Sequence, residues 1–211
     1  MNRIFLACAG GAALLALGSC ATMSEDQCLA GAWGEQGYSD GYAGLSESRL
    51  EAHAEACAKY GVVPDSRAYF SAREDGLRGY CVPERGFAEA VRGKGYAGVC
   101  RGPMEGAFLA AFSDGQEIYQ AEQAVSEARS RIDSLGARAA DLDDKIAYFE
   151  GQARDRDLTE EARDAARSRA RELRREREDT IRDWRRAQDE LDDAERRARD
   201  VRYYFQSRYS W

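Results

Sequence analysis

Residues 118–149 read IYQAEQAVSEARSRIDSLGARAADLDDKIAYF, and the spacing of their apolar residues predicts the fold of the second half of the chain. Apolar residues return every three or four positions, which is typical of a coiled-coil helix. The members of this first seam are Ile118, Ala121, Val125, Ala128, Ile132, Leu135, Ala139, Leu142, Ile146 and Phe149. A sustained period of 3.5 residues predicts a left-handed supercoil with a partner helix.

A polar break and a second helix start follow the first seam. The seam stops at Gly151, and residues 152–157 lack its pattern. Asp157 or Thr159 is the expected N-cap of the next helix, because short oxygen-bearing side chains satisfy the free amides of a first turn. We therefore expect a short turn between two long helices.

The second seam is smaller and more polar than the first. Its members are Ala166, Ala170, Leu173, Arg177, Thr180, Trp184, Ala187, Leu191, Ala194, Ala198, Val201 and Phe205. Two arms of about 45 residues, roughly 65–70 Å each at 1.5 Å per residue, predict an antiparallel hairpin over residues 103–205. Pro103 suits the first turn of this hairpin. Self-association of arms from two or more chains, giving a homo-oligomer, is the alternative.

The first twenty residues predict export and lipidation. An apolar run, Ile4 to Leu17, follows the basic Arg3 and is shorter than the roughly 20 residues that a membrane span needs. It is typical of a signal peptide, here over residues 1–19. Leu17-Gly18-Ser19-Cys20 resembles the lipobox, which is cut just before a lipid-bearing cysteine. An ordinary secretory signal or a short membrane anchor is the alternative.

The lipobox resemblance implies that Cys20 carries fatty acyl chains such as palmitate. Ala21 follows it where an aspartate would imply retention at the inner membrane, so we expect a periplasm-facing anchor in the outer membrane. Removing Arg3 with the signal leaves 31 − 1 = 30 basic residues against 38 acidic ones, a net charge of −8. This charge argues against nucleic-acid binding and against electrostatic adhesion to an anionic bilayer.

Four cysteines remain after Cys8 is removed and Cys20 is acylated. They are Cys28, Cys57, Cys81 and Cys100. An even number in an exported protein predicts two disulfides. A metal site is the weaker reading, because no pair has CxxC spacing and His53 is the single histidine.

Helix signals in the N-terminal half favour one pairing of these cysteines. Ser24 and Gln27 form a capping box, from which a helix is expected to run to about Gly44. A second helix is expected from residue 46 or 48 to Tyr60. An antiparallel pair of these helices would bring Cys28 and Cys57 together, and the Cys81–Cys100 bridge then follows by elimination.

Glycines recur on one face of the first expected helix. They are Gly31, Gly34, Gly37, Gly41 and Gly44. Glycine costs about 0.8–1 kcal/mol against alanine inside a helix, so such a stripe needs a reason. Close approach of a neighbouring helix is the expected one, with Trp33, Tyr38 and Tyr42 packing alongside.

Three segments share an aromatic residue followed, six or seven positions later, by Asp-Gly. The aspartates are Asp40, Asp75 and Asp114, spaced as a helical repeat would space them. A cation or ligand site formed by the three carboxylates is the functional alternative. Caps or local hydrogen bonds are favoured, because carboxylates on separate helices rarely form a site without further oxygen ligands.

The order of motifs in residues 24–115 resembles a family known as domain of unknown function 2799, found in proteobacterial lipoproteins. The motifs are Trp33-x3-Gly37-Tyr38-x-Asp40-Gly41, His53-x3-Cys57-x3-Gly61-Val62, Pro64-Asp65, Tyr80-Cys81-x-Pro83-Glu84-x-Gly86-Phe87 and Tyr96-x-Gly98-Val99-Cys100. The resemblance implies an exported, cysteine-bearing domain. It implies no activity and no binding residues.

The sequence offers no recognisable catalytic constellation. His53 lies in mid-helix and is expected to be a surface or half-buried packing residue. There is no GxSxG elbow and no phosphate-binding glycine loop. Carboxylate pairs such as Glu74–Asp75 leave a cell-wall glycan hydrolase as an alternative. We therefore expect no enzyme activity, no cofactor and no metal.

The C-terminal part of the second arm is rich in arginine and in aromatic residues. The run from Arg163 to Arg202 is interleaved with acids, which favours a solvated helix face over a nucleic-acid surface. Residues 203–211, YYFQSRYSW, hold five aromatics. They are expected to fold back onto the N-terminal domain, with an exposed docking segment as one alternative and a barrel signal as a poor one.

The sequence as a whole predicts an all-α protein. After the signal peptide we expect a disulfide-stapled helical head at residues 20–102, the antiparallel coiled-coil hairpin at 103–205 and an aromatic tail at 206–211. The expected function is that of a lipid-anchored scaffold that binds an unidentified envelope protein. An enzyme acting on the cell wall, or a ligand or cation sensor using acids of the head, is the alternative.

Overall fold

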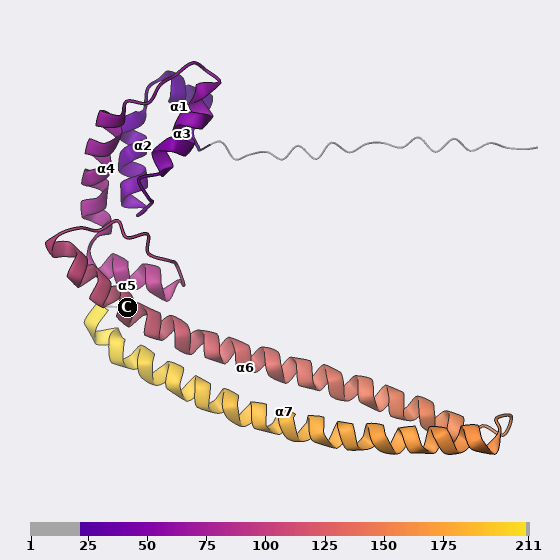
Figure 1. Cartoon of the computed structure of the whole chain (residues 1–211). Coiled ribbons are helices and arrows are strands. Elements are labelled where there is room, and N and C mark those ends of the chain that lie inside the picture. Colours follow the sequence, from indigo (N-terminus) through magenta and orange to yellow (C-terminus); the bar gives the residue numbers. More distant parts are fainter. Residues whose placement is uncertain (1–21, 210–211) are drawn as a thin grey trace, which may run out of the picture. The chain divides into compact units, whose positions relative to one another are not determined.

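The computed structural model describes residues 22–209, and the expected signal peptide and Cys20 lie outside them (Figure 1). The described residues form helices and no strand, which confirms the all-α prediction. The helices are α1 (Glu25–Leu29), α2 (Trp33–Tyr42), α3 (Arg49–Ala58), α4 (Ser66–Tyr80), α5 (Pro83–Val91), α6 (Pro103–Arg154) and α7 (Glu160–Tyr209). None of the helices in this part of the chain is both long and apolar enough to cross a membrane.

The described residues divide into two compact units. The first holds residues 22–80 and 97–99, and the second holds residues 81–96 and 100–209. The main segment of the first unit ends at Tyr80. The reason is α5, which the sequence analysis did not predict and which packs on the beginning of α6.

The helix expected from Ser24 to about Gly44 is divided, and this prediction is wrong in its length. The capping box is present, with Ser24 Oγ accepting from the Gln27 amide. The chain then leaves the helix after Leu29 and re-enters it at Trp33. Gly31 adopts φ +62° between the two helices, a conformation that glycine reaches without steric cost. This turn separates α1 from α2.

The glycine stripe marks a close crossing of α2 with α4. A Cβ at Gly37 or Gly41 would lie 2.2 Å from the carbonyl oxygen of Tyr69 or Arg73, respectively, and one at Gly76 would lie 2.2 Å from that of Tyr38. The prediction of close backbone approach is therefore confirmed at this crossing.

Other members of the stripe and its neighbours behave differently. A Cβ at Gly31 or Gly34 would meet nothing within 4 Å, so these two positions have no part in the crossing. Trp33 is buried in the core, as expected for packing, whereas Tyr38 and Tyr42 are about half exposed and stack on each other.

A second close crossing joins α5 to α6. A Cβ at Gly86 would lie 2.6 Å from the Phe108 carbonyl oxygen, and one at Gly115 would lie 2.5 Å from that of Phe87. The Asp-Gly signatures around Gly41, Gly76 and Gly115 therefore mark helices that meet another backbone. A packing constraint accounts for their similarity.

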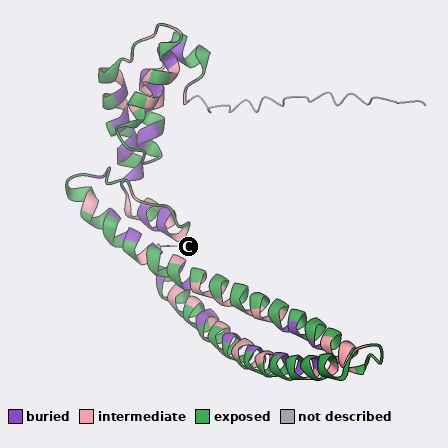
Figure 2. Cartoon of the chain, turned by 45° about the vertical axis from the view of Figure 1, so that its right-hand side comes forward, coloured by how far each residue is buried: buried purple, intermediate pink, exposed green. Residues whose placement is uncertain are grey.

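Helices α6 and α7 run side by side as an antiparallel hairpin, which confirms the predicted architecture (Figure 1). Every member of both seams is buried or half-buried, and the outer faces of both helices are exposed (Figure 2). The half-buried Trp184 lies opposite Gly136, where an added Cβ would be 3.8 Å from the indole nitrogen, an ordinary contact. Within the second seam, Thr180 is buried and its hydroxyl donates to the Glu176 carbonyl.

Ion pairs between the arms follow the antiparallel register. From the first pair to the last, the residue number rises along α6 while that of the partner falls along α7 from 202 to 174, the neighbours Glu176 and Arg177 being the one local exception. The pairs are Glu122–Arg202, Arg129–Glu195, Arg131–Glu190, Arg138–Glu176, Asp143–Arg177 and Glu150–Arg174. Exposed pairs contribute at most about 1 kcal/mol each, so they select the register more than they stabilise the hairpin.

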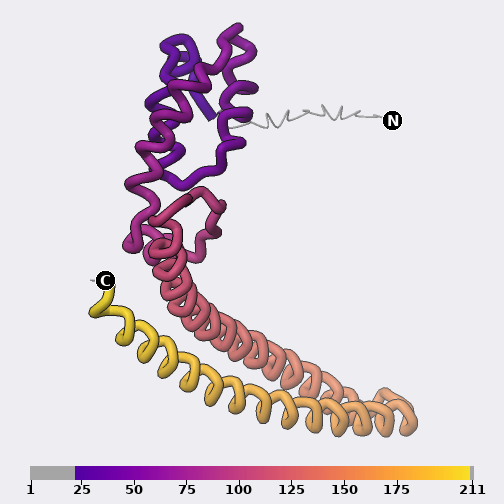
Figure 3. Tube along the Cα trace, turned by 60° about the vertical axis from the view of Figure 1, so that its left-hand side comes forward, coloured from indigo at the N-terminus to yellow at the C-terminus, as the bar shows by residue number. Residues whose placement is uncertain are grey.

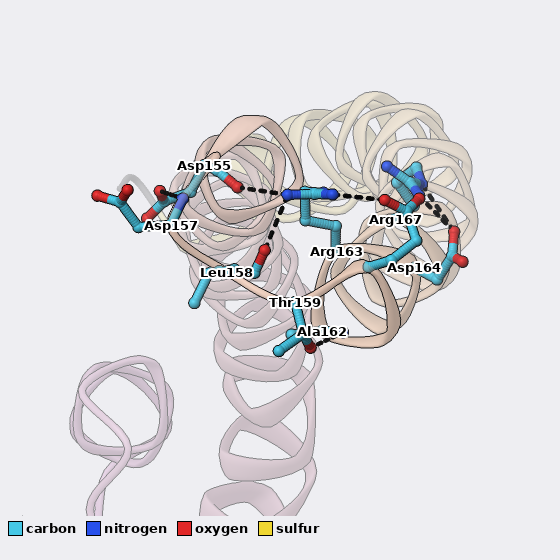
Figure 4. Close-up of polar contacts among 9 residues, drawn as sticks. Asp155, Asp157, Leu158, Thr159, Ala162, Arg163, Asp164 and Arg167 are labelled. Carbon is cyan, nitrogen blue, oxygen red and sulfur yellow. Dashed lines mark hydrogen bonds and ion pairs between the residues drawn. The ribbon is translucent and has the colours of Figure 1, made fainter.

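The turn at the end of the hairpin is held by its own side chains (Figure 4). Thr159 Oγ1 accepts from the Ala162 amide, which identifies Thr159 as the N-cap of α7. The Arg163 guanidinium donates to the carbonyls of Leu158, at 2.8 Å, and Asp155, at 3.3 Å. It thereby satisfies two backbone acceptors that the helices leave unpaired.

Candidate functional site

Asp40 is the centre of a buried polar network in the first unit. Its Oδ2 lies 2.7 Å from His53 Nε2 and accepts a hydrogen bond of 2.6 Å from the Tyr69 hydroxyl. Its Oδ1 accepts one of 2.9 Å from the Gln36 amide. These groups come from α2, α3 and α4, so the network links three helices. Three donors around one carboxylate offset the cost of taking it out of water.

His53 is fully buried, with 0 % exposure, and the expectation of a surface or half-buried residue is wrong. The signal that could have placed it is its spacing from Cys57. The two residues are four apart on α3, so they share a helix face, and Cys57 is also fully buried. A histidine on a buried face requires polar partners, which Asp40 and Thr22 provide.

The hydrogen bonds around His53 define which atoms donate. A carboxylate only accepts, so Nε2 of His53 donates to Asp40. On the other side of the ring, Nδ1 lies 2.7 Å from Thr22 Oγ1, which also lies 3.1 Å from the Ala52 carbonyl oxygen. The hydroxyl can therefore donate to a neutral ring or accept from a charged one while donating to Ala52. Either charge state of His53 is satisfied.

The order hydroxyl, imidazole, carboxylate resembles the connectivity of a catalytic triad. Its setting differs, because His53 and Tyr69 are completely buried and Asp40 is nearly so. Burial and the hydrogen bond to Asp40 raise the pKa of Tyr69 well above its ordinary value, so this hydroxyl stays protonated as a donor. The geometry is that of a polar cross-link between helices.

A second buried charge lies one turn further along α4. Arg73 is 1 % exposed, and its guanidinium donates at 2.6 Å to the carbonyl of Leu45, just beyond the end of α2. Its Nη1 lies 3.8 Å from Oε1 of Glu47. A cation at this position satisfies backbone acceptors near a helix C-terminus and interacts favourably with the helix dipole.

The two disulfides have the preferred pairing. Cys28 joins Cys57 within the first unit, and Cys81 joins Cys100 within the second. Cys28 and Cys57 are both fully buried in a core with Met23, Trp33 and Tyr69. Tyr96, between Cys81 and Cys100 in sequence, accepts a hydrogen bond of 2.7 Å from the Cys100 amide, so the segment closed by this bridge has a further restraint.

The three Asp-Gly aspartates each have their own partners. Asp40 belongs to the buried network, and Asp75 forms an exposed pair with Arg78 beside the exposed Glu74. Asp114 accepts a hydrogen bond from Tyr209 and pairs with Arg208. Within residues 22–209, no group of three or more His, Cys, Asp or Glu side chains is arranged to hold a metal ion.

The described part of the aromatic tail, which ends at Tyr209, is the last part of α7 and has both buried and exposed rings; Ser210 and Trp211 lie outside the described residues. Phe205 is 2 % exposed, and Tyr209 stacks on Phe87 of α5 at a centroid distance of 4.1 Å. The Tyr209 hydroxyl donates to Asp114 at 2.6 Å, and burial followed by this bond raises its pKa to about 12. The helix thus returns to the start of α6 (Figure 3).

Tyr203 and Tyr204 remain exposed, at 81 % and 70 %. They are neighbours of Phe205 on the same helix but point away from the core that Phe205 enters. Asp200, Gln206 and Ser207 line a shallow hollow around the two rings. Part of the tail therefore folds back as expected, while Tyr203 and Tyr204 remain exposed. An exposed docking segment was the alternative that the sequence analysis gave.

Comparison with known proteins identifies one related family. Residues 32–117 match a family described as protein of unknown function (DUF2799). No curated protein and no solved structure matches the chain. The motifs that carry the resemblance include Gly37 and Gly41 of the helix crossing and Asp40 and His53 of the buried network. Over residues 32–117 the chain is therefore similar to the DUF2799 family.

Proposed function

We propose that the chain is a non-enzymatic lipoprotein that is anchored in the outer membrane through Cys20 and binds another envelope protein through Tyr203 and Tyr204. The lipobox and the even number of cysteines support export and attachment to a membrane. The aromatic pair supports the binding role, and it is the observation on which that role rests.

Two adjacent exposed tyrosines on a fixed helix are typical of an interface anchor. Tyrosine provides a large contact area, and few rotatable bonds have to be ordered on binding. Phe205 and Tyr209 hold this end of α7 against α5 and α6, so the exposed rings are offered on a rigid element. A partner protein that inserts an apolar side chain into the hollow beside the rings fits this surface.

The long hairpin supports a scaffold role. Helix α6 has 52 residues and α7 has 50, which at 1.5 Å per residue corresponds to roughly 75 Å. Between its ends, large apolar side chains are mostly covered by the opposite arm, and Tyr148 near the turn is the main exception in the described residues. This arrangement favours a single-chain hairpin over the alternative in which arms of several chains share the seams.

Site-specific photocrosslinking in cells tests the binding role. A photoreactive phenylalanine at position 203 or 204 should give a covalent adduct with one envelope protein. The matched control is position 148, because Tyr148 is also an exposed tyrosine, at 61 %, on the same hairpin. Identical adducts at all three positions, or none at 203 and 204, would contradict the proposed role.

The lipid anchor is tested separately. Intact mass spectrometry of the cell-made protein should show a chain that begins at Cys20 and carries acyl groups. A chain that begins at Met1, without acyl groups, would remove the anchor from the proposal and leave the crosslinking result to stand alone.

A further inference from the structure

The first residues that the structure describes are held by three different kinds of contact. Thr22 Oγ1 lies within hydrogen-bond distance of Ala52 and His53. Met23 is 1 % exposed and belongs to the core cluster of Cys28 and Trp33. Ser24 follows as the N-cap of α1, with its amide donating to the Gln27 side chain at 2.8 Å. The chain is therefore held by contacts of the folded unit from Thr22 onwards.

Thr22 is only two residues beyond the cysteine that is proposed to carry the lipid. Two residues span at most about 7 Å between Cα atoms, even when fully extended. A chain of this length cannot separate the head from the surface in which the acyl chains are buried. Flexible spacers of 20 residues, by contrast, have end-to-end distances of about 25 Å.

We propose that residues 22–24 act as a rigid stop that seats the head directly on the headgroups of the lipid leaflet. This inference rests on the proposed lipid anchor and adds the orientation that the anchor imposes. The side of the first unit nearest to Thr22 faces the lipid; Ala52 of α3 is on this side, and its exposed neighbours along the helix are Arg49, Glu51 and Glu55.

The charge of this surface is consistent with contact through the covalent anchor. Arg49 is accompanied by Glu51 and Glu55, so the surface has no basic excess that would attract an anionic leaflet by itself. The lipid supplies the affinity, and the contacts of Thr22, Met23 and Ser24 supply the orientation.

Energy transfer to the bilayer tests the inference with the full-length, acylated protein. A fluorescent amino acid replaces Glu51 or, in a second protein, Asp75 of α4, both of which are exposed. The proteins are placed in phosphatidylethanolamine and phosphatidylglycerol vesicles that contain an acceptor-labelled headgroup. The position-51 donor should transfer more efficiently than the position-75 donor.

A matched variant carries twenty glycine and serine residues inserted between Ala21 and Thr22. Because this spacer moves the head about 25 Å on average, transfer from position 51 should fall about twofold or more, and the difference between the positions should vanish. Equal transfer from both positions without the insertion, or no change on insertion, would overturn the inference. Failure of the protein to float with the vesicles would instead overturn the lipid anchor itself.

Discussion

Asp40 Oδ2 and His53 Nε2 lie 2.7 Å apart in the interior of the first unit, with side chains 4 % and 0 % exposed. The two residues are on different helices, and Tyr69 from a third helix donates to the same carboxylate oxygen. The pair therefore ties α2, α3 and α4 together. Its energetic weight comes from burial, since a polar group left without its partner in this setting pays its full desolvation cost.

Replacing Asp40 should destabilise the first unit strongly. Asp40→Ala leaves the donors of the buried His53 and Tyr69 and of the half-buried Gln36 without their acceptor, and each buried donor left unsatisfied costs about 1–3 kcal/mol. Chemical denaturation followed by circular dichroism measures the loss.

The matched control for that variant is Asp75→Ala. Asp75 lies in the same kind of Asp-Gly motif but is exposed and paired only with Arg78 at the surface. Its loss should change the free energy of unfolding by about 0.5 kcal/mol or less. Similar losses at positions 40 and 75 would show that the buried network does not stabilise the fold.

Alanine at two glycines of α2 should have opposite effects. In Gly41→Ala the new methyl would lie 2.2 Å from the Arg73 carbonyl oxygen, so α4 has to move, at a cost of about 1–3 kcal/mol. In Gly34→Ala the methyl meets nothing within 4 Å, and stability should rise by about 0.4–1 kcal/mol. Thermal unfolding of the two variants measures both changes in stability, and a gain in stability from the substitution at position 41 would contradict the close crossing.

Each disulfide should protect its own unit. Loss of the Cys28–Cys57 or the Cys81–Cys100 bridge should cost about 2–4 kcal/mol, with an added cavity cost in both cases because all four cysteines are buried. Hydrogen exchange should accelerate in α2 and α4 of the Cys28→Ala/Cys57→Ala variant. In Cys81→Ala/Cys100→Ala it should accelerate in α5 and the start of α6. The same pattern in both variants would contradict two separate units.

Docking of the α7 C-terminus should weaken at high pH. The pKa of Tyr209 is raised from 10.0 to about 12, so its contribution is complete below pH 10. Above pH 10 the unfolded chain ionises first, and the contribution is lost as the pH approaches 12.

Comparison with Tyr209→Phe isolates this titration from that of Tyr69, which both proteins retain. The midpoint of thermal unfolding should fall more steeply for the native protein than for the variant between pH 10 and 11.5. Parallel curves would mean that the hydroxyl of Tyr209 does not contribute through Asp114.

The sequence predicted the hairpin well because its information is local and repeated. Apolar residues recur every three or four positions in each seam, and every member of both seams is buried or half-buried between the two helices. The caps at Ser24 and Thr159 are also local signals, and both are present. The Cys28–Cys57 pairing followed from where these cysteines lay relative to expected helix ends, and the second pairing followed by elimination.

Predictions failed where a property depends on residues distant in sequence. Burial of His53 depends on Asp40 and Tyr69, which are brought to it by two other helices. Helix α5 is short and its apolar side is covered by α6, a distant partner in sequence, so the sequence analysis did not predict this helix. Gly31 was counted in the stripe although it interrupts the helix.

Heptad spacing, helix caps and the even number of cysteines by themselves determined a helical chain with a long hairpin and a disulfide-linked head. The first two signals lie in residues close in sequence, and the third needs only a count of cysteines. Only the tertiary structure decided that Asp40 and His53 are buried together, that the backbone which meets Gly41 is that of α4, and that Tyr203 and Tyr204 stay exposed beside Phe205. Burial depends on how helices pack against one another, so the residue pattern of a single helix does not determine it.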